Sequence, residues 1–168
     1  MLRQSKGRTT QVTDEDIAPN DLVLVRHLPA TPENVYRCWT EPELIKQFFA
    51  PAPGTCPEAQ VDPRPGGAFR VVMEFEEHGR MDGPPGCVLI AEPGRRFAWT
   101  DALGPEFRPK ADGFFSADIT FTAIPEGCEY RVVARHADAD SAQKHREMGF
   151  EEGWGTVAEQ LGRLAATL

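Results

Sequence analysis

The sequence has no long apolar run and no excess of basic residues. It holds 18 lysine and arginine residues against 26 aspartate and glutamate residues, which gives a formal net charge of −8 at pH 7. A protein that binds the phosphate backbone of nucleic acid needs a basic face, and an anionic lipid surface makes the same demand. A membrane-spanning helix needs about 18 consecutive apolar residues. We therefore expect no binding to nucleic acid and none to a membrane.

Cysteine is scarce and scattered. Cys38, Cys56, Cys87 and Cys128 form no Cys-x-x-Cys pair, and the first residues contain no apolar segment of the kind that directs secretion. This combination predicts a cytoplasmic protein whose cysteines are free thiols. A disulfide between two of them is the less favoured alternative.

The familiar catalytic and metal-binding motifs are also missing. There is no nucleophile elbow, no phosphate-binding glycine loop and no His-Glu-x-x-His sequence. His136, Asp138, Asp140 and His145 lie close together in the sequence, but their spacing matches no metal motif. The two aspartates are better explained as residues that satisfy the free N–H groups at the start of a helix. We expect no catalytic residues, no metal and no cofactor.

What the sequence does contain is an α+β pattern of strands and helices. A chain of 168 residues is long enough for one domain with a substantial core. Residues 1–20 are polar and show no periodicity, which predicts a flexible tail. Residues 21–168 are expected to form a single domain.

The first part of this domain is expected to be a strand followed by two short helices. Apolar residues alternate over residues 22–28. Thr31 is placed to cap the first helix, with Pro32 at its first position. Thr40 is placed to cap the second helix, and Glu43 three residues later completes a capping box.

Turn residues then set the register of the expected hairpins. Residues 64–67 (Arg-Pro-Gly-Gly) favour a type II turn. A turn at residues 93–94 places Ile90 opposite Phe97. It also places Val88 opposite Trp99.

The hairpin of the last two strands admits two registers. A two-residue turn pairs Asp118 with Arg135 and Ala117 with His136, whereas a three-residue turn pairs Asp118 with Ala134. The first register gains a cross-strand ion pair and matched apolar pairs. It is therefore favoured by ~1 kcal/mol.

The C-terminal part has the pattern of one long helix. Apolar residues recur there at alternating steps of four and three: Phe150, Trp154, Val157, Leu161, Leu164 and Leu168. A helix over residues 141–167 would be roughly 40 Å long. A compact chain of this length has a radius of gyration of only ~15 Å, so the helix must cross the whole sheet.

Three glycines interrupt this helical pattern. Gly149, Gly153 and Gly155 each cost roughly 1 kcal/mol relative to alanine inside a helix. A close approach of the helix to the sheet or to a ligand would explain them. The alternative is a break in the helix near Gly149.

Three segments carry a resemblance to a known family. They are residues 30–35 (Ala-Thr-Pro-Glu-Asn-Val) with residues 39–42 (Trp-Thr-Glu-Pro), residues 61–67 (Val-Asp-Pro-Arg-Pro-Gly-Gly), and residues 153–154 (Gly-Trp). In this order they resemble the family named after the activator of heat-shock-protein-90 ATPase. This family is a branch of the START-like superfamily, which includes the birch pollen allergen, lipid-transfer domains and polyketide cyclases.

The resemblance covers roughly residues 22–168 and implies a helix-grip fold. In this fold a curved antiparallel sheet of six to seven strands is crossed by a long C-terminal helix, with two short helices after the first strand. A cavity between sheet and helix would suit a small hydrophobic or aromatic molecule.

Aromatic and apolar residues from several elements are the candidates for lining that cavity. The candidate ligand-binding residues are Trp39, Phe49, Phe69, Val71, Met73, Val88, Phe97, Trp99, Phe121, Tyr130, His136, Phe150 and Trp154. The alternative for the apolar members is that they form only the core. His136 is the best polar candidate, because a neutral imidazole can bind a carbonyl or shuttle a proton, and its alternative is a place at the rim. Tyr130 is a second candidate donor.

Three hypotheses about function follow. Binding or carriage of the small molecule leads, because no residue set is adequate for covalent catalysis. The second hypothesis is a cyclase or aromatase in which the pocket folds a reactive chain and one acid–base group assists. The third is a co-chaperone or a partner in the stress response. The exposed sheet edges also leave room for a homodimer.

Overall fold

The structure, a computed structural model, describes residues 16–168, so most of the predicted tail (residues 1–15) lies outside the described part of the chain. In chain order the elements are β1 (Asp21–Leu28), α1 (Pro32–Thr40), α2 (Pro42–Phe48), β2 (Thr55–Val61), β3 (Ala68–Phe75), β4 (Gly79–Met81), β5 (Gly86–Glu92), β6 (Arg96–Thr100), β7 (Leu103–Gly104), the short 3-10 helix η2 (Pro105–Phe107), β8 (Arg108–Pro109), β9 (Ser116–Ile124), β10 (Gly127–Arg135), α3 (Ala139–Glu147) and α4 (Phe150–Ala165). Within residues 16–168, none of the helices has the length and apolarity needed to cross a membrane.

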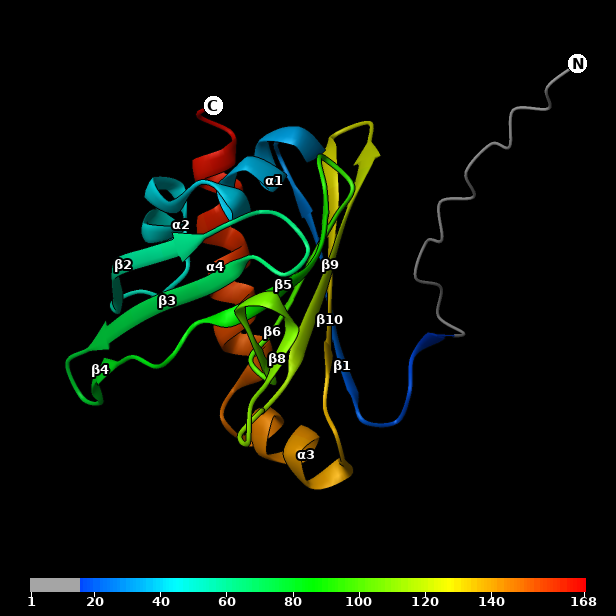
Figure 1. Cartoon of the computed structure of the whole chain (residues 1–168). Helices are drawn as coiled ribbons and strands as arrows, with labels where there is room; N and C mark the ends of the chain where they lie inside the picture. Colours follow the sequence, from blue (N-terminus) through cyan, green and yellow to red (C-terminus); the bar gives the residue numbers. More distant parts are fainter. Residues whose placement is uncertain (1–15) are drawn as a thin grey trace, which may run out of the picture.

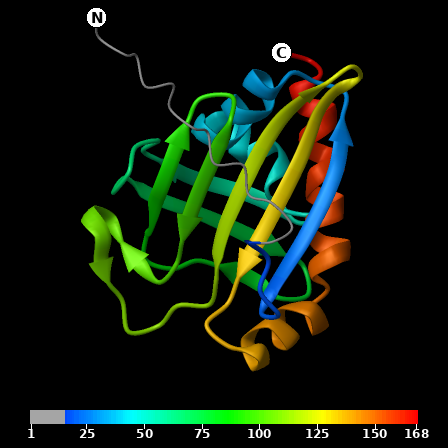
Figure 2. The same cartoon turned by 90° about the vertical axis from the view of Figure 1, so that its right-hand side faces the viewer.

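The strands form one curled antiparallel sheet with helices on its concave side (Figure 1). Its strand order is β1-β10-β9-β6-β5-β3-β2, with β4 paired to β3, while β7 and β8 form a separate small ribbon. Figure 2 shows the convex face, with α4 running behind the β1 edge of the sheet. One face of the sheet is thus packed against helices, as is usual for antiparallel sheets. The predicted α+β helix-grip fold is confirmed.

The start of the first short helix agrees with the prediction, but the start of the second does not. Thr31 accepts a hydrogen bond from the Asn34 backbone N–H at 3.2 Å, so the predicted first cap is confirmed. The predicted capping box of the second helix is wrong. Thr40 is the last residue of α1 and its hydroxyl donates to the Tyr36 carbonyl at 3.1 Å, because Pro42 fixes the first position of α2.

The β5–β6 hairpin follows half of the predicted register. Val88 lies opposite Trp99, as predicted, but Ile90 lies opposite Ala98 and not Phe97. A bulge between Val88 and Ile90 inserts one unpaired residue in β5, and this shifts every pair nearer the turn.

Both predicted registers of the β9–β10 hairpin are wrong. Ala117 pairs with Ala134 and not with His136, which lies beyond the end of β10. The turn has two residues, as in the favoured register, but it lies one residue earlier: residues 125–126 form the loop and Gly127 already belongs to β10. Gly127 has a φ of 148°, in the region that favours glycine.

The predicted ion pair between these strands nevertheless forms. Asp118 lies opposite Val133, and the Arg135 guanidinium reaches its carboxylate diagonally at 2.8 Å. Arg96 of the third strand binds the same carboxylate at 2.7 Å. Burial raises the pKa of Asp118, but the hydrogen bonds from Arg96 and Arg135 outweigh it and hold the pKa below its ordinary value. One carboxylate thus ties three strands together on the convex face.

The predicted continuous C-terminal helix is wrong, and the alternative break near Gly149 is confirmed. α3 ends at Glu147 and α4 begins at Phe150. Gly149 between them has a φ of 86° and a ψ of 44°, the left-handed conformation with which many helices end. α3 therefore turns away under the lower edge of the sheet, and only α4 crosses it (Figure 1).

The other two helical glycines have different explanations. A Cβ atom at Gly155 would lie 3.2 Å from Nη2 of Arg26, so the predicted close approach of helix and sheet is confirmed there. A Cβ atom at Gly153 would meet none of the described residues within 4 Å. Close packing therefore gives no reason for glycine at position 153.

The same substitution should have opposite effects at two of these positions. Gly149→Ala should lower the free energy of unfolding by about 1–2 kcal/mol, because an L-residue is strained in the left-handed region. Gly153→Ala should raise it by up to ~1 kcal/mol, because alanine is the better helix former and the space beside it is open. Urea unfolding of the two variants measures both changes. Equal signs would contradict the break at Gly149.

Candidate functional site

The space between the concave face and α4 is occupied by a group of aromatic rings. We call this group the ring cluster and define it as Trp39, Phe48, Phe49, Phe69, Phe97, Trp99, Phe115 and Trp154. Trp39 is fully buried at its centre and stacks on Trp154, with ring centroids 6.4 Å apart and an interplanar angle of 18°. Phe69 stacks in turn on Trp99 at 4.5 Å. The cluster joins the helices α1, α2 and α4 to the strands β3 and β6 through aromatic contacts.

The structure brings nearly all the predicted ligand residues into one apolar core. The fully or almost fully buried ones are Trp39, Phe69, Val88, Phe97, Trp99, Phe121, Tyr130 and Phe150. The partly buried ones packed against them are Phe49, Val71, Met73 and Trp154. These residues would be buried here whether they line a ligand cavity or only form the core. Contact of these side chains with a ligand therefore stays a prediction.

Three polar atoms inside this core lack a hydrogen-bond partner among the described residues. They are Nε1 of Trp39, Nε1 of Trp99 and the hydroxyl oxygen of Tyr130. Burial raises the pKa of Tyr130 far above its ordinary value, so the hydroxyl keeps its proton. The Trp39 indole opposes this rise, but the two groups do not reach hydrogen-bond geometry. Leaving a buried polar group unpaired costs about 1–3 kcal/mol.

His136 lies on the concave side, but it is already fully bonded. Its Nδ1 lies 2.9 Å from the Asn20 carbonyl, and its Nε2 lies 2.8 Å from Nδ1 of His145. A carbonyl can only accept, so Nδ1 of His136 carries the proton. Nε2 of the neutral ring then accepts from Nδ1–H of His145. His136 is left with no ring nitrogen for a ligand or for a proton shuttle.

His145 is a residue whose role the sequence did not reveal. It projects from α3 into a pocket of rings formed by Phe114, Phe115 and Phe150, with centroid distances of 4.8 to 5.1 Å. Burial, and then the neighbouring His136, lowers the pKa of His145 to about 4. The bond between the two rings therefore fastens α3 to the end of the sheet.

Arg26 is a second residue that sequence reasoning missed. It lies on the concave side of β1 opposite Tyr130, and its guanidinium passes over Gly155 of α4. Its Nη1 donates to the Val25 carbonyl at 2.9 Å, and no described acidic side chain forms an ion pair with it. The signal was an interrupted pattern, because the other concave-side residues of β1, Leu22, Leu24 and Leu28, are all buried leucines.

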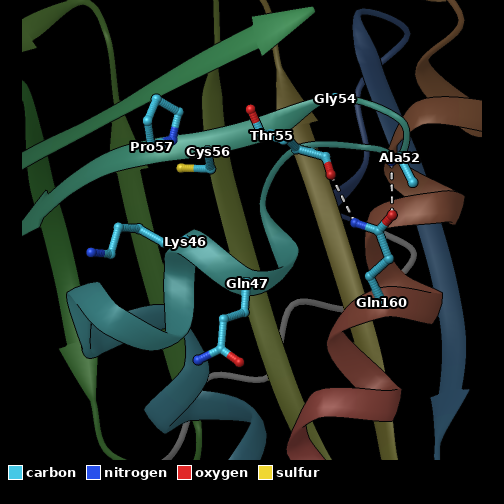
Figure 3. A pocket seen from close by; sticks show the side chains of 9 residues that line it. Lys46, Gln47, Ala52, Gly54, Thr55, Cys56, Pro57 and Gln160 are labelled. Atoms are coloured by element: carbon cyan, nitrogen blue, oxygen red, sulfur yellow. Dashed lines mark hydrogen bonds between the residues drawn. The ribbon is translucent and has the colours of Figure 1, made fainter.

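A hollow of about 340 Å³ opens beside this core, between α2, β2 and α4 (Figure 3). We call it the α2–β2 hollow, and its lining residues are Lys46, Gln47, Ala50, Ala52, Gly54, Thr55, Cys56, Pro57 and Gln160. Burial raises the pKa of the Cys56 thiol, which disfavours the nucleophilic thiolate. Lys46 is paired with Glu43 at 2.8 Å. The hollow thus holds no activated nucleophile.

Gln160 fastens α4 to the loop that borders this hollow. Its Nε2 donates to the carbonyls of Phe48 and Ala50, at 2.9 and 2.8 Å, and its Oε1 accepts from the Ala52 N–H at 2.8 Å. Figure 3 shows the side chain reaching from the helix to the loop. One amide therefore satisfies three backbone groups that the proline-rich loop leaves without secondary-structure partners.

Other polar side chains near the site have local structural roles. Among residues 16–168, no three histidine, cysteine, aspartate or glutamate side chains gather in a way that could hold a metal ion. Asp138 accepts a hydrogen bond from the Ser141 N–H at 2.7 Å as the cap of α3, which is the role predicted for this part of the sequence. The four cysteines are free, as predicted, and all four are buried.

Gln160→Ala should lower the free energy of unfolding by about 1 kcal/mol, because it leaves two part-buried carbonyls, of Phe48 and Ala50, without this partner. Gln47→Ala is the matched control, since Gln47 lines the same hollow but is exposed and binds only the Glu43 carbonyl of its own helix. Urea unfolding measures both. Equal small losses would show that the Gln160 bonds do not hold the loop.

Stability should fall on acidification through His145. Its pKa is about 4 in the folded protein against an ordinary value of 6.5, so between these values the unfolded chain binds a proton that the folded protein does not. The contribution is complete above pH 6.5 and is lost as the pH falls towards 4. It should amount to on the order of 2 kcal/mol, less than the full shift because solvent screens part of it.

The measurement is urea unfolding between pH 4 and 7.5 on the wild type and on His145→Gln, which cannot titrate. The variant should show a flatter dependence than the wild type across this window. His78→Gln removes an exposed histidine as a control and should retain the slope. Parallel profiles for wild type and His145→Gln would contradict the assignment.

Comparisons with known proteins agree with this architecture. The family model described as "Activator of Hsp90 ATPase homolog 1-like protein" matches residues 29–166. A crystal structure of a protein from Nitrosomonas europaea is 37% identical, with a TM-score of 0.85, and the match covers 90% of this chain and 97% of that one. The solution structure of an AHSA1-like protein from Aeromonas hydrophila has the same fold at 15% identity, with a TM-score of 0.65 and coverage of 88% and 92%. A comparison with curated proteins finds no match. The chain belongs to the family of activator of Hsp90 ATPase homolog 1-like proteins.

Proposed function

We propose that this protein binds a small apolar or aromatic molecule between the concave face of its sheet and α4. The observation that carries the proposal is the pair of buried, unpaired polar groups at the centre of the aromatic wall, Nε1 of Trp39 and the hydroxyl of Tyr130. Native proteins keep few such groups, and each one asks for an explanation. A ligand with a hydrogen-bond acceptor, such as a carbonyl oxygen, would provide the missing partner.

The walls of this site supply the apolar contacts. A ligand that buries ~200 Å² of apolar surface gains on the order of 5 kcal/mol before entropy costs are subtracted. The ring cluster presents flat faces from both α1 and the sheet, which suits a ring-bearing molecule. Polar groups would then fix its orientation.

Room for the ligand has to come from movement of partly buried rings. Trp154 and Phe49 are packed against the core but are not fully enclosed, so they are the rings that can swing outward. Trp154 lies in the first two turns of α4, close to the left-handed Gly149 that separates α3 from α4. The free energy of this opening reduces the apparent affinity, because only the open fraction of molecules can bind.

Binding is favoured over a cyclase-type reaction by the state of His136. An acid–base mechanism needs a ring nitrogen that faces the substrate, and both nitrogens of His136 are engaged with Asn20 and His145. The Cys56 thiol, whose pKa burial raises, is no better a candidate.

Tyr130→Phe should affect stability and binding in opposite directions. Removing a buried, unpaired hydroxyl should leave the free energy of unfolding unchanged or raise it by about 1 kcal/mol. The same change should weaken binding of 6-propionyl-2-(dimethylamino)naphthalene, a neutral fluorescent ketone, by about tenfold, since the hydroxyl is proposed to donate to its carbonyl. Emission titrations and urea unfolding give the two quantities.

Tyr36→Phe is the matched control, because Tyr36 packs edge-on against Phe97 and Phe121 but its hydroxyl is not among the buried unpaired groups. It should bind the ketone as the wild type does. Native mass spectrometry of protein isolated from cells adds a probe-free test, in which a retained small molecule is expected. Equal affinities of wild type and Tyr130→Phe, with no retained molecule, would refute the proposal.

A further inference from the structure

We propose that the ligand carries a carboxylate and that Arg26 binds this group at the seam between β1 and α4. This inference rests on the proposed function and adds to it a chemical class, an apolar or aromatic acid. It assigns one end of the molecule to a cation on the sheet and leaves the apolar body to the ring cluster.

The position of Arg26 places its charge at the wall of the proposed site. Arg26 and Tyr130 are directly opposite in the β1–β10 pair, so their side chains leave the sheet on the same concave face. Across the seam, the Arg26 guanidinium lies against Gly155. The guanidinium is therefore held between sheet and helix. Its cross-strand neighbour is Tyr130, whose buried hydroxyl is unpaired.

The Arg26 side chain is also unusual in its surroundings. Elsewhere in this acidic protein, half-buried arginines of the sheet bind carboxylates, as Arg70 does with Asp82 at 2.7 Å and Arg96 with Asp118 at 2.7 Å. Arg26 is partly buried as well, yet within residues 16–168 its recorded bond is to the carbonyl of its own neighbour, Val25. A cation removed from part of its water and not paired loses hydration without compensation.

A carboxylate is the group that fits this cation best. The planar guanidinium offers a fork of N–H donors that matches the two oxygens of a carboxylate, and such charge-assisted bonds are stronger than neutral ones. Arg26 has one end of its fork turned to the Val25 carbonyl through Nη1, which leaves Nη2, the atom beside Gly155, for a ligand.

The glycine of α4 is what allows this arrangement. Gly155 lies in the interior of α4, where glycine is unfavourable relative to alanine. The Cβ atom of any other residue at this position would lie 3.2 Å from Nη2 of Arg26. The preceding residue, Trp154, stacks on Trp39. A molecule anchored at Arg26 would therefore extend its apolar part towards these two rings.

Because of the net charge of the protein, a preference for acids over neutral analogues would be strong evidence for a cationic site. At −8 the molecule as a whole repels anions. A neutral analogue should therefore bind better than its acid unless a specific cation reverses the order. Preference for the acid, lost when Arg26 is changed, would identify that cation.

The test is a titration of the whole chain with matched pairs of acids and primary amides that share a naphthyl, phenyl or octyl body. Each is measured by displacement of 6-propionyl-2-(dimethylamino)naphthalene. In the wild type at least one acid should bind about tenfold more tightly than its amide. Arg26→Gln should remove this difference, because it weakens binding of the acid far more than binding of the amide.

Two further variants keep the result interpretable. Arg108→Gln removes the same charge from the exposed ribbon strand β8 and should retain the preference for the acid. Gly155→Ala leaves the charge in place but displaces the guanidinium, and should reduce the preference. If Arg26→Gln does not fold, Gly155→Ala still decides the matter.

The outcomes separate the two proposals. If acids and amides bind equally to the wild type, or if Arg26→Gln keeps the preference for the acid, the carboxylate site is refuted while ligand binding stands. If neither the acids, the amides nor the fluorescent ketone binds, the proposed function itself fails.

Discussion

The stacking of Trp39 between α4 and the sheet is the contact on which the rest of the structure depends. Trp39 is fully buried and touches rings from α2, from β3 and β6, and from α4. A curled antiparallel sheet has one apolar face that must be covered, and in this protein no single helix covers it alone. The indole joins the short helices and the long one into a single layer, so the concave face becomes an interior.

Features with one strong local signal could be predicted from the sequence, and features that depend on a choice between similar local alternatives could not. The Thr31 cap and the alternation in β1 involve contacts within a few residues, and both are found as predicted. The β9–β10 register failed because Gly127 was placed in the turn, whereas it is the first residue of β10, and this moves every pair along the strand. The bulge in β5 leaves no mark in the local pattern at all.

The same distinction applies to the candidate site. The aromatic residues recur at the spacing that places them on the inner faces of the strands and helices. Their packing against one another was therefore predictable once the fold was known. Whether they meet a ligand or only one another was not, because that depends on single atoms such as Nε1 of Trp39. The bond between His136 and His145 joins the end of a strand to a helix, and only the turn of the chain after β10 makes it. Arg26 was visible as a break in a row of leucines, but its place against Gly155 required the position of α4.

The three hydrogen bonds of Gln160 also make the two halves of α4 different. They anchor the second half of α4 to the loop after α2, while the first half is preceded by a single left-handed glycine. Under the proposed function, the half of α4 that would move to admit a ligand is the one that carries Trp154, because Gln160 anchors the other half. Changes of sequence in the first two turns of α4 would then alter which molecules pass, and changes near Gln160 would alter whether the layer holds together.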